Sequence, residues 1–115
     1  MKLTNENLKQ MFNHANRKYF NNELPNIPIT WKKKLMRNGA VGECVFYRDD
    51  KKHPKKVTSV EIYLHTWLQD YPPYLIQTLL HEMVHLKLGV RVHHGKVFQK
   101  EIRRLVAVGA YDGIL

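Results

Sequence analysis

The segment from position 81 to position 85 has residue types at spacings that suit hydrolysis at a metal ion. His81 and His85 are four residues apart, so in a helix they project about 40° apart on one face, one turn above the other. Two imidazoles placed in this way can reach a single ion. Glu82 projects about 60° from His85, beside the ion, where a carboxylate can accept a proton from the attacking water. The segment therefore predicts a metal site with a general base next to it.

A third ligand has to come from another part of the chain, because a catalytic zinc ion usually has three protein ligands and one open position. The chain offers His93, His94 and, further on, Glu101. Position 91, six residues after His85, is Arg91. This residue excludes both the metzincin spacing and the H-x3-H-x5-H pattern of bacterial endoribonucleases.

These residues resemble the SprT-like zinc metalloproteases, a family that includes the Spartan proteases, which digest DNA–protein crosslinks. The pattern of that family is an HExxH helix, then a histidine–glycine pair and an aromatic residue three positions after the glycine. Here it reads HEMVH at 81–85, then His94-Gly95 and Phe98. The resemblance extends to a helix that ends in YFNNELP at 19–25 and a strand that ends at Trp31, and so covers nearly the whole chain.

The resemblance implies which residues carry the chemistry. It makes His94, in preference to His93, the third zinc ligand beside His81 and His85. Glu82 is then the general base, and afterwards the general acid, of a zinc-dependent endopeptidase. The implied substrates are proteins bound or crosslinked to DNA. Two other functions stay open: a DNA-binding module with a structural zinc site, and a general peptidase not linked to DNA.

Other residues of suitable type have ordinary interpretations. Glu101 is expected to form a salt bridge near Arg104 and Lys100. Tyr111 is expected to be a packing or surface tyrosine, and a position near the reaction centre is the alternative. The remaining histidines lack ligand-like spacing and are expected on the surface or in ordinary packing: His14, His53 and His65.

Length and composition limit the class of protein. A chain of 115 residues can form one domain, 1–115, with a real core. It has no apolar run of about 20 residues for a bilayer span, and its N-terminus is not typical of a signal peptide. We therefore expect a monomer in the cytoplasm with no membrane partner. Cys44 is the only cysteine, which excludes an intrachain disulfide.

The chain is also strongly basic. Nineteen Lys and Arg residues against ten Asp and Glu residues give a net charge of +9, which favours association with polyanions. The basic residues gather after the first expected strand, in the loop after the second and along the last helix, within 32–37, 48–56 and 96–104. We expect this surface to bind DNA, single-stranded or at a junction. The other interpretation is a solvated surface that aids solubility.

Hydrophobic periodicity predicts the elements that position these residues. Intervals of three and four residues predict a helix from Thr4 to Phe20, an HExxH helix from the Pro72-Pro73 pair to Gly89, and a last helix from Gly95 to about Val108. Alternating patterns predict strands at Ile27–Trp31, Val41–Tyr47 and Val57–Leu64. Short connections favour an antiparallel meander packed on the helices, in a zincin-like α+β domain. One strand, not identified by its sequence, is expected to bind an extended substrate at the sheet edge.

Overall fold

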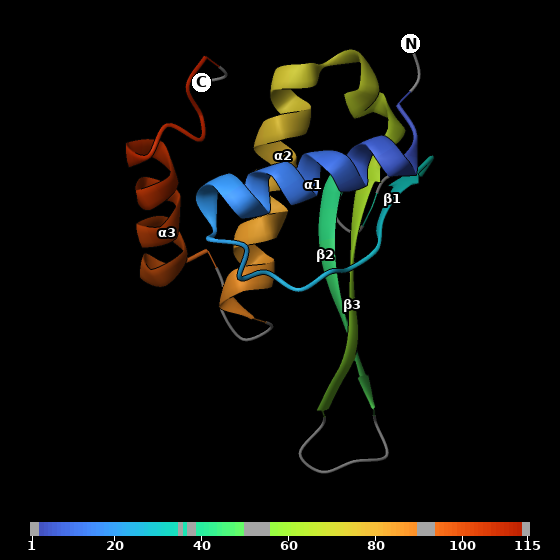
Figure 1. Cartoon of the computed structure of the whole chain (residues 1–115). Helices are drawn as coiled ribbons and strands as arrows, with labels where there is room; N and C mark the ends of the chain where they lie inside the picture. The colour runs from blue at the N-terminus through green and yellow to red at the C-terminus, as the bar shows by residue number, and fades with distance from the viewer. Residues whose placement is uncertain (1–2, 35, 37–38, 50–55, 90–93, 114–115) are drawn as a thin grey trace.

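The structure is a computed structural model that describes residues 3–34, 36, 39–49, 56–89 and 94–113. Figure 1 shows the elements, which in chain order are α1 (Asn5–Tyr19), β1 (Ile29–Lys32), β2 (Gly42–Asp49), β3 (Lys56–His65), the 3-10 helix η2 (Thr66–Asp70), α2 (Pro72–Leu88) and α3 (Lys96–Ala107). Each helix and strand expected from the sequence is present, with ends that differ by a few residues. The short helix η2 was not expected. The overall class, α+β, is confirmed.

The sheet is mixed, so the expected antiparallel meander is wrong. β3 lies in the middle and pairs antiparallel with β2, but it pairs parallel with β1, with Ile29 opposite Ile62. Parallel neighbours need a connection that returns the chain to the same end of the sheet. The segment 33–55, which contains β2, provides that connection. The prediction of a meander failed because β1 and β2 are consecutive in sequence but do not pair with each other.

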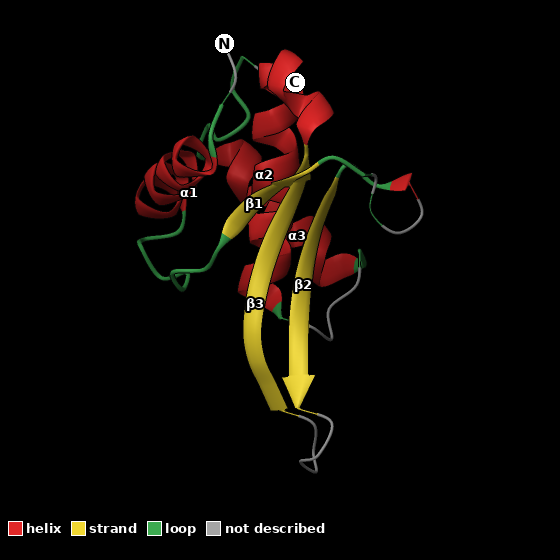
Figure 2. Ribbon diagram, turned by 90° about the vertical axis from the view of Figure 1, so that its right-hand side faces the viewer, coloured by secondary structure: helices red, strands yellow, loops and turns green. Residues whose placement is uncertain are grey.

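The core lies between one face of the sheet and the helices. Figure 2 shows the sheet in front, with α2 and α3 behind it and α1 to its left. Ile62 and Leu64 of β3 are fully buried on the covered face. They belong to one core cluster with buried side chains of the helices, among them Leu8, Phe12, Leu68, Leu75, Leu80, Met83, Phe98 and Leu105. Within the described residues, no helix is both long and apolar enough to cross a membrane.

The ends of α1 follow the sequence closely. Thr4 caps the first turn through a reciprocal pair of hydrogen bonds with Asn7. Asn21 and Asn22 then take the left-handed conformation, with φ of 53° and 60°, which asparagine tolerates better than most residues. The turn directs the chain back beneath the helix toward β1.

Candidate metal centre

Helix α2 places two of the expected ligands. Its apolar side chains, Leu75, Leu79 and Met83 among them, are buried against the core. His81 and His85 lie one turn apart and are both half-buried. One side of the helix therefore fixes its position, and another presents two imidazoles at the surface.

The turn that leads into α3 brings the third imidazole to the other two. The Nε2 atom of His94 lies 3.2 Å from that of His81 and 2.9 Å from that of His85. One ligand atom from each of the three histidines falls within a group no wider than 4.8 Å. Nitrogen ligands about 2.0–2.1 Å from a tetrahedral zinc ion are separated by roughly 3.3 Å. The three side chains could thus hold one such ion. The other candidate ligand, His93, lies outside the described residues.

Phe98 forms the apolar base of this cluster. Its ring centroid lies 4.9, 4.7 and 4.8 Å from those of His81, His85 and His94, and the side chain is 2% exposed. The aromatic ring fills the space that water would otherwise occupy beneath the imidazoles. The sequence marked Phe98 only as part of a pattern, and the structure gives the physical reason for an aromatic residue there.

The histidine environments favour neutral rings. Burial lowers the pKa of His81, and the charge of His94 lowers it further. Burial, together with the charges of His81 and His94, lowers the pKa of His85 to about 4. Because metal ions bind the neutral imidazole, these shifts keep the nitrogen lone pairs available near neutral pH.

Glu82 is buried beside the histidines, with only 6% of its surface exposed. Burial raises its pKa to about 7, the negative charge of Glu43 also raises it, and a hydrogen bond from the backbone N–H of Cys44 opposes the change. The start of β2 thus shapes the electrostatics of this carboxylate. Neither residue could have been paired with Glu82 from sequence, because nothing in their spacing relates strand β2 to helix α2.

Gly42 allows β2 to approach α2 this closely. A Cβ atom at this position would overlap the Cγ2 methyl of Thr78 and would lie 3.1 Å from Oε2 of Glu82. The backbone of β2 can therefore lie this close to α2 only because residue 42 has no side chain. No sequence pattern predicts this requirement, because the glycine is needed for a tertiary contact and not for a turn.

Two hollows flank His81. One, of about 310 Å³, is lined by Glu82 and the start of β2, including Val41 and Gly42. The other, of about 290 Å³, is lined by His81, His94 and Tyr111 together with side chains of α3. The two hollows thus lie on either side of His81.

A model of the SprT-like family matches residues 8–112 of this chain. The chain belongs to the SprT-like family. No curated protein matches it. The match runs from α1 to the turn after α3, so it includes the three histidines, Glu82 and the strand segment that contacts it.

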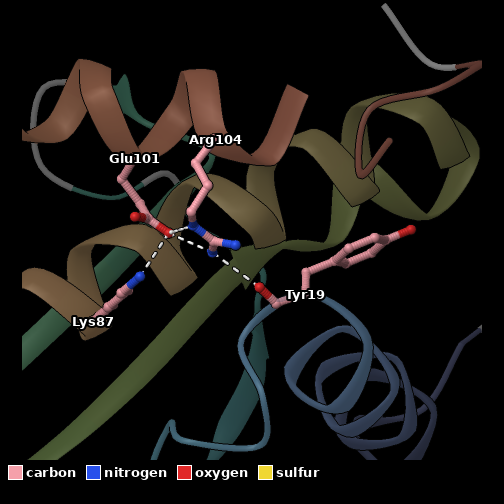
Figure 3. Close-up of polar contacts among 4 residues, drawn as sticks. All are labelled: Tyr19, Lys87, Glu101 and Arg104. Atoms are coloured by element: carbon pink, nitrogen blue, oxygen red, sulfur yellow. Dashed lines mark hydrogen bonds and ion pairs between the residues drawn. The ribbon is translucent and has the colours of Figure 1, made fainter. Parts of the chain in front are cut away.

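A charged clamp joins the helices of this SprT-like domain (Figure 3). Oε1 of Glu101 accepts hydrogen bonds from Nζ of Lys87 at 2.9 Å and from Nε of Arg104 at 2.8 Å. Arg104 also donates to the carbonyl oxygen of Tyr19 at 2.9 Å, so α1, α2 and α3 are connected. The expected partner Arg104 is confirmed, but the second cation is Lys87 of α2 and not Lys100. Glu101 lies in this clamp and is not part of the histidine cluster.

Tyr111 and the other histidines considered from the sequence lie outside the cluster of three Nε2 atoms or outside the described residues. Tyr111 is 7% exposed and packs in the core, yet it also borders the hollow beside His81. His14 is exposed on α1. His65 joins two segments, since its Nε2 lies 3.1 Å from the carbonyl oxygen of Lys33 and its Nδ1 accepts the backbone N–H of Trp67. His53 lies outside the described residues.

Proposed function

We propose that this SprT-like domain is a zinc-dependent endopeptidase in which His81, His85 and His94 hold the metal. The observation that carries the proposal is the convergence of three Nε2 atoms beside a buried carboxylate. Three imidazole donors with one open position suit a catalytic zinc ion. The separations of the Nε2 atoms and the lowered pKa values of two rings support this fit.

When bound, a zinc ion supplies Lewis acidity that acidifies water and polarises the scissile carbonyl. Glu82 accepts the proton of the attacking water and then delivers it to the leaving amine. A pKa raised to about 7 suits both steps near neutral pH. The backbone N–H of Cys44 orients the carboxylate, and Phe98 keeps water from the inner side of the histidines.

The strand that binds substrate is proposed to be β2. Both β1 and β2 are edges of the sheet, but it is the start of β2 that lines a hollow together with His81 and Glu82. An extended peptide can add to such an edge through backbone hydrogen bonds. A peptide on β2 would pass beside Glu82, whereas a peptide on β1 would lie across the sheet from it.

The substrates are proposed to be proteins bound or crosslinked to DNA. The net charge of +9 supports this choice, because it attracts polyanions and with them the proteins that they carry. Lys32, Lys33 and Lys34 are all exposed, as are Lys96, Lys100 and Arg103 on α3. A peptidase that has no link to DNA would cleave free and DNA-bound proteins equally well.

Substitution of Glu82 by Gln tests the proposed chemistry. The Glu82→Gln variant is expected to bind zinc as the unmodified chain does. It should cleave casein or histone at least about 100-fold more slowly, since general-base catalysis contributes 10²–10⁴-fold to the rate. Chelation should abolish cleavage by the unmodified chain, and added zinc should restore it. Zinc content is measured by elemental analysis, and cleavage by gel electrophoresis with and without single-stranded DNA.

The result that contradicts the general-base role is full activity in Glu82→Gln. Stoichiometric zinc without cleavage of any protein, in the presence or absence of DNA, would instead favour a structural zinc site. Cleavage at a rate that DNA does not change would retain the peptidase and remove its link to DNA.

A further inference from the structure

A cluster of three aromatic side chains lies on the surface where the chain passes from η2 into α2. Trp67, Tyr71 and Tyr74 are 45%, 43% and 58% exposed. The ring of Trp67 is centred 4.4 Å from that of Tyr71 and 6.3 Å from that of Tyr74. Large exposed rings that contact one another are uncommon on a surface without a partner, and they are not required by the core.

The backbone at Lys33 lies close to the aromatic cluster. His65 connects the two, because one ring nitrogen lies 3.1 Å from the carbonyl oxygen of Lys33 and the other accepts the N–H of Trp67 at 3.0 Å. Lys33 is flanked by Lys32 and Lys34, and all three are exposed. Asp70 is the single acidic residue between positions 62 and 77. The three lysines at 32–34 against this one carboxylate make the summed formal charge of the two segments positive.

Tyr74, the member of the cluster within α2, lies on nearly the same helix face as His81 of the candidate metal centre. Tyr74 precedes His81 by seven residues on α2, which corresponds to about 10 Å along the axis and a rotation of about 20°. A polymer bound on the aromatic rings would thus lie within about two helical turns of the histidines. A polymer at this distance could deliver an attached protein to the histidines.

We propose that Trp67, Tyr71 and Tyr74, with Lys32, Lys33 and Lys34, bind single-stranded nucleic acid. Flat rings stack on unpaired bases, and lysines neutralise the phosphates between them. A duplex hides the faces of its bases, so it can use only the lysines. This inference rests on the DNA link of the proposed function and names the site that would make it, whereas the binding test itself does not require the peptidase to be active.

Removal of the rings tests the stacking half of this proposal. Binding of a fluorescently labelled oligothymidylate of about 15 nucleotides, within the usual range of site sizes, is followed by anisotropy. Trp67→Ala and Tyr74→Ala should each weaken binding about tenfold, as expected for the loss of one stacked base. Trp67→Phe should bind within about threefold of the unmodified chain because it keeps a ring. Tyr47→Ala is the matched control, since Tyr47 is 41% exposed but belongs to β2.

Removal of charge tests the lysine half. For single strands, the logarithm of the binding constant falls with that of the salt concentration with a slope of about 0.7 per neutralised phosphate. The double variant Lys33→Ala, Lys34→Ala should therefore reduce the slope by about 1.4. Lys18→Ala, which removes an exposed lysine of α1, should leave the slope unchanged.

Three outcomes would overturn the proposal. The first is equal affinity of the ring variants, confirmed as folded by circular dichroism, and the unmodified chain. The second is equal loss in Trp67→Phe and Trp67→Ala. The third is a change of oligomeric state in Trp67→Ala without a change in binding, which would make the cluster a contact between copies of this chain. Cleavage of free casein reports separately on the peptidase, so inactivity there leaves the binding result intact.

Discussion

At the scale of single residues, Glu101 shows how one carboxylate holds α2 and α3 together beside the three histidines. Its Oε1 atom receives donors from Lys87 on α2 and Arg104 on α3, and the Glu101 side chain is 9% exposed. The two cations are 34% and 38% exposed, so solvent screens part of each interaction. The clamp should therefore contribute moderately to stability and more decisively to the position of α3.

Substitution of Glu101 by Gln is expected to reduce the free energy of unfolding by about 1–2 kcal/mol, since charge-assisted hydrogen bonds are lost. Burial alone would raise the pKa of Glu101, but the hydrogen bonds and charges of Arg104 and Lys87 outweigh it and lower the pKa from its usual 4.5. A lowered pKa stabilises the fold above the unfolded pKa, and this stability is lost as the pH falls through the folded value. The deficit of Glu101→Gln should thus be full at neutral pH and should shrink below 4.5.

Urea unfolding of both chains across this pH range measures the effect. Lys100→Gln, which removes an exposed charge from the same helix, is the control and should change stability by less than about 0.5 kcal/mol. Equal stability of Glu101→Gln and the unmodified chain at neutral pH would show that the clamp only positions α3.

The residues of the candidate site differ in how far the sequence could predict them. His81, Glu82 and His85 lie on one helix, so helical spacing alone places them together. His94 needed the family pattern, because spacing cannot give the path between α2 and α3. Other contributors were found only in the structure, since they come from a distant strand: Gly42, Glu43 and the backbone of Cys44.

At the scale of elements, the contact between β2 and α2 sets the position of Glu82. Gly42→Ala should destabilise the fold by about 1–3 kcal/mol, the usual cost of an overpacked contact, and should lower kcat by moving Glu82. Thr78→Ser removes the Cγ2 methyl that the new Cβ atom would overlap. The double variant should therefore recover most of the stability, which a double-mutant cycle of urea unfolding quantifies. Additive effects of the two changes would contradict the close contact.

The elements also show where sequence analysis fails. The helices were predicted nearly in full, because each has an apolar side with a period of about 3.6 residues and recognisable ends, such as Thr4 and Gly89. The strands were found as well, but not their arrangement. A strand such as β1 carries the same alternating pattern whether it pairs parallel or antiparallel, and its partner is set by the path of the whole chain.

At the scale of the whole molecule, a zinc ion would connect α2 with α3. Two proposed ligands lie on α2, and the third lies two residues before α3 begins. Among the described residues, Lys87 of α2 and Glu101 of α3 also join these helices through a side-chain ion pair. An ion that binds the folded chain alone stabilises it, by about 4 kcal/mol at a thousandfold excess over Kd. The stability of the entire fold should thus depend on whether the site holds zinc.

This coupling predicts that chelation lowers the Tm of the unmodified chain by at least several degrees, since about 1 kcal/mol shifts the Tm of a domain this small by roughly 4 °C or more. Without the third ligand, zinc can no longer join α3 to α2, so His94→Ala should melt at nearly the same temperature with zinc and with chelator. His14→Ala removes an exposed histidine from α1 and should keep the full difference. Differential scanning calorimetry of the three chains measures these shifts. If zinc raised the Tm of His94→Ala as much as that of His14→Ala, then the ion would bind without residue 94, and α3 would be held by its packing and the Glu101 clamp alone.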